Sequence, residues 1–152
     1  MGPAFDRSDE FAIDKPACMA CPNLDEDDCC AIHHRLEKAG FRGCILYDCL
    51  GAGQRVVQEL YAGRPWRDDP DRLPEMWQAL TSLRGVHELI LLLATAAKAP
   101  LPGRERRTLE ALRAELEPAE GWTVESLEAF AAGPVPGRVR VFLMSLRSYF
   151  TR

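Results

Sequence analysis

The chain has no long apolar stretch and no apolar segment near its start. Its longest apolar stretch, Leu89–Ala97, is interrupted only by Thr95 and is much shorter than the ~20 residues that a membrane-spanning helix needs. The segment before Lys15 contains nothing like the hydrophobic centre of a secretory signal. These absences predict a cytoplasmic protein that does not cross a membrane.

A clustered positive face is also missing from the first third. The net charge is -4, and residues 1–53 contain twice as many acidic as basic side chains. Nucleic-acid binding needs grouped Lys and Arg, so we expect no nucleic-acid partner. Past Gly133 the sequence has arginines and no acid, which we interpret as the solvated face of a final helix.

Cysteine is absent after Cys49, although the chain contains six. Buried cysteines that act as small hydrophobic residues would be scattered along the chain. Here they are grouped, and two of the three histidines share their window. The cysteines and these histidines are Cys18, Cys21, Cys29, Cys30, Cys44, Cys49, His33 and His34.

Three kinds of cysteine chemistry compete to explain this group. A disulfide framework is typical of small secreted chains and lacks its signal here. A redox Cys-x-x-Cys pair would sit in a strand-rich pattern, which does not surround Cys18 and Cys21. Metal binding accounts best for the number, the pairing and the mixture with histidine. Six cysteines and two histidines exceed the four ligands of one zinc ion, so Zn²⁺ and an iron–sulfur cluster both remain candidates.

The segment from Cys29 to Ala39 is predicted to be a helix ended by Gly40. Cys30 and His33 would then leave the same face, at a spacing of three. Pairing Cys29 with His33, or Cys30 with His34, fits a spacing of four equally well. The acidic residues Asp25–Asp28 are interpreted as a cap and solvated turn, with an auxiliary cation site as the alternative.

Several short motifs of the first half resemble the N-terminal cysteine-rich domain of bacterial pentapeptide-repeat proteins. They are Phe11-Ala-Ile-Asp-Lys-Pro-Ala17, Cys21-Pro-Asn-Leu24, Cys30-Ala-Ile-His33, Gly40-Phe-Arg-Gly-Cys44 and Tyr47-Asp-Cys49-Leu-Gly-Ala-Gly-Gln54, followed by Trp66-Arg67 and Val86-His87-Glu88-Leu89. More broadly, the layout resembles zinc- or iron-chelating cysteine-cluster proteins. The resemblance implies that the ligands are Cys21, Cys30, Cys44 and Cys49, with His33 as a further candidate and Cys29 less favoured. The family has a further cysteine-rich stretch upstream, so that either Cys18 supplies the additional ligand or the site is incomplete, and no pentapeptide period follows residue 98.

Helical periodicity dominates the second half. Apolar residues recur at three and four from Arg72 to Ala99, and Leu89–Leu93 is apolar nearly all round, which is typical of a helix buried by its neighbours. Further helices are predicted at Arg104–Leu116 and at Val124–Ala132 with Thr123 as N-cap, and then at Arg138–Tyr149. No strand pair is apparent.

The sequence therefore predicts an all-α protein with one domain over residues 1–152. A loop-rich Cys/His metal-binding segment at 14–54 would join a small helical bundle at 70–150. We expect a non-catalytic scaffold that binds a protein partner. The alternatives are an iron-dependent enzyme or redox protein assisted by His87 or His34, and a metal sensor or carrier with a spare thiol such as Cys29 or Cys18.

Overall fold

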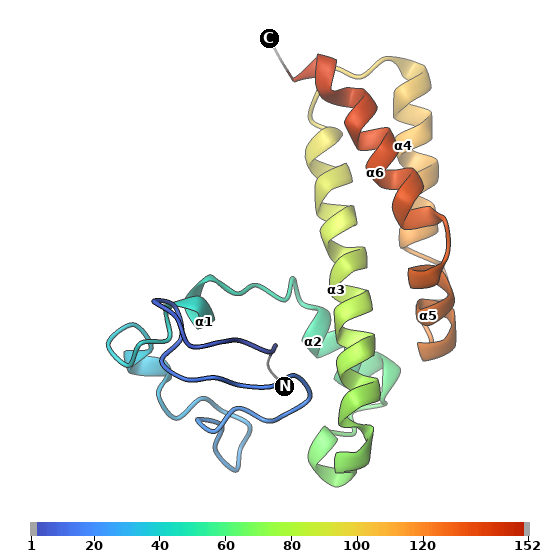
Figure 1. Cartoon of the computed structure of the whole chain (residues 1–152). Coiled ribbons are helices and arrows are strands. Elements are labelled where there is room, and N and C mark those ends of the chain that lie inside the picture. Colours follow the sequence, from blue (N-terminus) through green and yellow to red (C-terminus); the bar gives the residue numbers. More distant parts are fainter. Residues whose placement is uncertain (1–2, 151–152) are drawn as a thin grey trace. The chain divides into compact units, whose positions relative to one another are not determined.

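The computed structural model describes residues 3–150, which divide into two compact units (Figure 1). The first unit contains the chain up to Cys49 together with Trp66–Trp77. The second contains Leu50–Pro65 and the chain from Gln78 onward. This division does not follow the predicted segment boundary at residue 54, and the single domain over 1–152 stays a prediction.

Helices account for all the regular structure of the described residues, which confirms the all-α class. The α-helices are α1 (Arg42–Leu46), α2 (Ala52–Arg55), α3 (Leu73–Ala96), α4 (Gly103–Leu116), α5 (Val124–Ala132) and α6 (Val135–Ser145). Short 3-10 turns lie at His33–Arg35, Trp66–Asp68, Pro70–Arg72 and Leu146–Tyr149, and a π-helical turn at Val56–Leu60 follows α2. Within residues 3–150 the β-type pairing is limited to two isolated bridges, Phe5 with Lys15 and Leu24 with Cys30.

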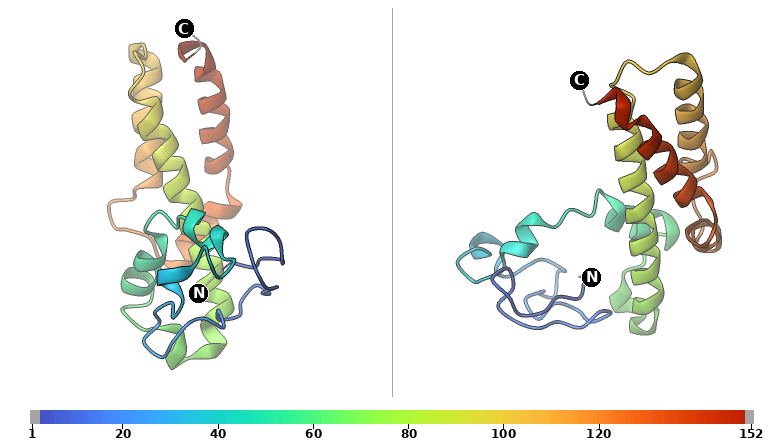
Figure 2. Two further views of the ribbon diagram at one scale, coloured as in Figure 1. Left: turned by 90° about the vertical axis from the view of Figure 1, so that its left-hand side faces the viewer. Right: turned by 45° about the horizontal axis from the view of Figure 1, so that its top comes forward.

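The core of the second unit lies between α3, α4, α5 and α6 (Figure 2). Leu109, Leu112 and Leu116 are buried on one face of α4, as their spacing predicted. Leu127 of α5 and Val139 of α6 are completely buried. The final α-helix begins at Val135, three residues before its predicted start, because proline is tolerated in the first turn, where its missing N–H is not needed.

The long helix α3 confirms the predicted periodicity at its buried positions. Met76, Leu83 and Val86 are each about 1% exposed. The prediction that Leu89–Leu93 is covered on every side is wrong, since Leu91 and Leu92 are 52% and 46% exposed. One side of this helix is therefore open in the described structure.

One described helix, Pro70–Ala96, is long and apolar enough to cross a membrane by length and composition alone. Its most apolar window has a mean hydropathy of 1.3 and is 39% buried inside the protein. Core helices pass the same test, and the regularly spaced buried side chains of α3 are those of a core helix. The feature is too weak to assign a membrane span.

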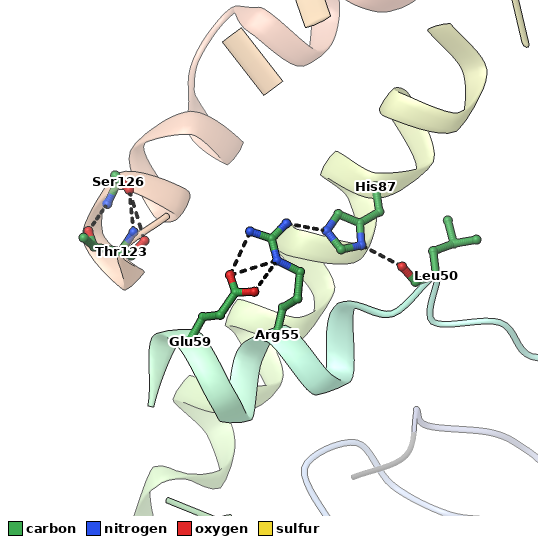
Figure 3. Close-up of polar contacts among 6 residues, drawn as sticks. All are labelled: Leu50, Arg55, Glu59, His87, Thr123 and Ser126. Carbon is green, nitrogen blue, oxygen red and sulfur yellow. Dashed lines mark hydrogen bonds and ion pairs between the residues drawn. The ribbon is translucent and has the colours of Figure 1, made fainter. Parts of the chain in front are cut away.

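Helix α5 begins with the N-cap that the sequence predicted. The Thr123 hydroxyl accepts the backbone N–H of Ser126, and the Ser126 hydroxyl accepts the N–H of Thr123 (Figure 3). This reciprocal pair satisfies two amide groups that the first turn leaves without helical partners.

The first unit contains little helix and is built from turns. The predicted helix over Cys29–Ala39 is wrong: only His33–Arg35 forms a 3-10 turn, and turns continue to Gly40. The physical reason lies in the preceding acidic residues. The Asp25 carboxylate accepts the amide N–H groups of Asp27 and Cys29 and so closes a tight loop instead of capping a helix.

Candidate metal centre

Three cysteines and one histidine line a single cavity in the first unit. The cavity has a volume of about 480 Å³. Its lining residues are Cys21, Cys30, His33 and Cys44, with Asn23, Leu24, Leu36 and Ile45. Four candidate ligands predicted from the sequence are thus brought to one place.

The loop between Cys21 and Cys30 folds back on itself to bring these two residues to the cavity. The N–H of Leu24 donates to the carbonyl of Cys21 at 3.0 Å, and Leu24 pairs with Cys30 in an isolated bridge. His33 follows by a turn in which its N–H donates to the Cys30 carbonyl at 3.0 Å. Cys30 and His33 are therefore brought close together by a turn, and not by the helix that was predicted.

Arg67, which lies far away in the sequence, binds the acidic loop through hydrogen bonds. Its guanidinium donates to the Asp28 carboxylate at 2.7 Å and to the carbonyl of Asp25, and it also lies over the Trp66 ring. Asp25 and Asp28 are thus used to shape a turn, as predicted, whereas the predicted helix cap is wrong because no helix begins at Cys29. Asp28 adopts a positive φ of 60°, an unfavourable conformation that these contacts help to hold.

Cys44 reaches the cavity from the short helix α1 because its neighbour is glycine. A Cβ atom on Gly43 would lie 2.5 and 2.8 Å from Cε2 and Cε1 of Phe11 and closer still to Cζ. The Gly43 N–H donates to the Glu10 carbonyl at 3.1 Å. Helix α1 can therefore pack against the aromatic ring only at this residue.

The thiols are close enough to influence one another electrostatically. Burial raises the pKa of the Cys44 thiol, and the charges of Cys21 and Cys30 raise it further. A raised pKa means that Cys44 holds its proton at neutral pH and must lose it on binding a metal. A cation in the cavity would remove the mutual repulsion of the thiolates.

The remaining predicted residues do not line this cavity. Cys49, which the resemblance implied as a ligand, and Cys18 are half-buried elsewhere, and Cys29 is exposed. Among residues 3–150, no three or more His, Cys, Asp or Glu side chains stand in a geometry that could hold a metal ion. Metal binding by the cavity residues would therefore require them to move inward around the ion.

His87 on α3 uses both of its ring nitrogens within the second unit (Figure 3). Nε2 lies 3.0 Å from the Arg55 guanidinium, and Nδ1 lies 2.7 Å from the carbonyl oxygen of Leu50. Because arginine has only donors, Nε2 accepts and the proton resides on Nδ1. The neutral ring thus holds the turn just after Cys49, where Leu50 and Gly51 have positive φ angles of 54° and 78°.

Arg55 extends this network to Glu59. Its Nε lies 2.9 Å from both carboxylate oxygens, and this hydrogen bonding lowers the pKa of Glu59. Leu50, Arg55, Glu59 and His87 form what we call the His87 network. These contacts favour the interpretation of His87 as a hydrogen-bonded packing residue over a role at a reactive centre.

Replacing His87 by Leu is expected to destabilise the second unit by about 1–3 kcal/mol, because the Leu50 carbonyl and the Arg55 guanidinium lose a partner in a half-buried position. Urea unfolding followed by circular dichroism measures the change. Glu88→Ala is the matched control, since Glu88 is exposed and forms only a weak ion pair with Arg84, at the long distance of 4.0 Å. Equal stability of the two variants would contradict the structural role of His87.

Sequence reasoning missed two residues that shape the cysteine-bearing loops, Lys15 and Arg67. No helical or strand-like apolar period surrounds Lys15. Its neighbours Asp14 and Pro16 are typical of an exposed loop. Both residues did carry a signal, because the resemblance includes Lys15 in its Phe11–Ala17 motif and Arg67 in Trp66-Arg67.

Comparison with known proteins gives a partial match. The chain is 38% identical over 86 residues to the uncharacterized protein YybG of Bacillus subtilis (strain 168), a segment that is 57% of this chain and 31% of YybG. The match thus spans about a third of that relative. No family model matches the chain, and no solved structure matches it. The resemblance to pentapeptide-repeat proteins stays a prediction.

Proposed function

We propose that the first unit binds one Zn²⁺ ion through Cys21, Cys30, His33 and Cys44, and that this ion is structural. The observation that supports the proposal is the convergence of three sulfur ligands and one imidazole on one cavity. Three cysteines and one histidine are a common tetrahedral zinc set. An iron–sulfur cluster takes four cysteines in most proteins, and Cys49 does not line this cavity.

A structural role agrees with how little else holds the first unit together. Helix α1 has five residues, and the buried apolar side chains of this unit are few: Ile32, Phe41, Leu73 and Met76. A small loop-rich unit of this kind usually needs a metal or disulfides to remain ordered. The ion would hold together three separate segments, those of Cys21, Cys30 and Cys44.

In this proposal the helical unit presents a surface to a partner protein. Between α4 and α6 lies a cavity of about 450 Å³. It is lined by Arg104, Arg107 and Arg138, together with Thr108, Ala111, Leu112, Val141 and Phe142. Val141 is 63% exposed there. Basic walls around an exposed apolar floor suit an acidic segment with apolar side chains.

Elemental analysis and a visible spectrum of one anaerobically purified sample test the metal assignment. The expected result is about one zinc per chain, as four ligands for a single tetrahedral ion predict, and no colour. Cys44→Ser should lose the zinc, whereas the matched variant Cys29→Ser should retain it, because both thiols are exposed but only Cys44 lines the cavity. Iron with sulfide would support the redox alternative instead, and a sample without metal would overturn the proposal.

A further inference from the structure

Lys15 is the one charged side chain that is buried among residues 3–150, with 4% of its surface exposed. Its ammonium group donates to the carbonyl oxygens of Pro16 at 3.1 Å and Met19 at 2.9 Å, and it lies 5.6 Å from the centre of the Phe5 ring. The two carbonyls flank Cys18 in the sequence. A buried ammonium is therefore held in place at the turn that leads to Cys21.

Burying a charge costs free energy unless opposite charge or hydrogen bonds compensate it. Burial lowers the pKa of Lys15, and the negative charges of Cys21 and Cys18 oppose this change. The two carbonyl groups compensate the buried ammonium, and the Cys21 and Cys18 sulfurs add to this compensation when they are ionised. This pairing links Lys15 to the cysteines.

A second cavity places Lys15 beside two of the proposed zinc ligands. This cavity has a volume of about 340 Å³, and its lining includes Lys15, Phe5, Cys21 and Cys44. Cys21 and Cys44 also line the zinc cavity. The two cavities therefore have Cys21 and Cys44 in common, whereas Lys15 lines only the second cavity and His33 only the first.

We propose that Lys15 is a positioning residue whose positive charge compensates a metal centre with an excess of thiolates. The inference rests on the proposed zinc function and deepens it. Three thiols and one neutral imidazole bind Zn²⁺ with release of three protons, so the resulting centre carries one net negative charge. A neighbouring ammonium stabilises that anion relative to the metal-free state, in which the thiols are protonated and neutral.

Whether the Lys15 charge increases zinc affinity depends on the number of thiolates that bind the ion. A centre with two thiolates and two imidazoles would be neutral and would gain nothing from Lys15. A centre with three or four thiolates is anionic and would lose affinity when the ammonium is removed. The affinity of a Lys15 variant therefore reports the charge of the bound centre.

The test measures Zn²⁺ affinity of the full-length protein by competition with a chromophoric chelator. Lys15→Met removes the charge and keeps the length of the side chain, and Lys15→Arg keeps the charge. Lys38→Met is the matched control, because it removes the same charge from an exposed position in the same unit. We expect Lys15→Met to bind zinc about tenfold more weakly, the order of magnitude expected for one partly screened unit charge beside the site. Lys15→Arg and Lys38→Met should remain close to the wild type.

A measurement on the unaltered chain guards against misfolding of the Lys15→Met variant. The side-chain ¹³Cε resonance of Lys15 reports its ionisation, and zinc should keep the ammonium protonated to higher pH. Unchanged affinity in a folded Lys15→Met protein, or an unchanged Lys15 titration on zinc binding, would overturn the inference and leave the zinc site standing. Failure of the wild type to bind zinc would overturn the proposed function itself.

Discussion

Removing the bound metal with a chelator is expected to abolish the protection of residues 14–49 against amide exchange, while α4, α5 and α6 keep theirs. Binding of structural zinc contributes ~10–16 kcal/mol in small zinc domains, and this free energy is folding free energy. The first unit has few buried apolar side chains to replace it, whereas the second has completely buried Leu93, Leu127 and Val139. The loss of order should therefore be confined to the cysteine-bearing part.

Hydrogen exchange followed by mass spectrometry, before and after chelation, measures this effect peptide by peptide. Cys44→Ser should show the exchange of the chelated protein without any chelator, and Cys29→Ser should show that of the metal-bound protein. Peptides from α4 serve as the internal reference. Unchanged exchange in residues 14–49 after the metal is lost would exclude a structural role for the ion.

Local signals decided which helices could be predicted from the sequence. Helix α4 begins one residue before its predicted start and ends at the predicted Leu116, and α5 has both predicted bounds. In these segments an apolar period of three and four coincides with clear start signals, Pro102 directly before α4 and a Thr N-cap before α5. Long-range interactions were not needed to place them.

The cysteine-bearing part could not be predicted in the same way, because individual side-chain contacts, some local and some between distant residues, determine it. The residues from Cys29 to Ala39 favour a helix by composition, but Asp25 binds the Cys29 amide and Arg67 binds the loop from outside. No periodic pattern records such contacts. The sequence indicated which residue types would gather, and the cavity further separates Cys21, Cys30, His33 and Cys44 from Cys18, Cys29 and Cys49.

His87 illustrates a related limit. Its sequence position left two interpretations open, a packing residue or a group aimed at a reactive centre. Only the distances to Leu50 and Arg55 showed that both ring nitrogens are engaged. The partners lie more than thirty positions away in the sequence, and nothing in the local pattern around His87 identifies them.

Gly43→Ala is expected to destabilise the first unit by about 1–3 kcal/mol, the usual cost of adding a methyl group to a site without room for it. The added Cβ would overlap the Phe11 ring, which cannot simply turn away. Phe11 stacks on Phe5 with ring centres 4.2 Å apart, and Phe5 meets Phe41 edge-on at 6.5 Å. Helix α1 would have to move instead, and Cys44 with it, so zinc affinity should fall together with stability.

The matched control for that substitution is Gly85→Ala in α3, where a Cβ meets nothing within 4 Å. There the same change should stabilise the protein by up to about 1 kcal/mol, since alanine is the better helix former. Urea unfolding followed by tryptophan fluorescence and circular dichroism distinguishes the two variants. The stability changes of the two variants are expected to have opposite signs. A general preference for alanine in helices would instead predict that both variants gain stability. A Gly43→Ala protein as stable as Gly85→Ala would show that the close approach of α1 to Phe11 does not position Cys44.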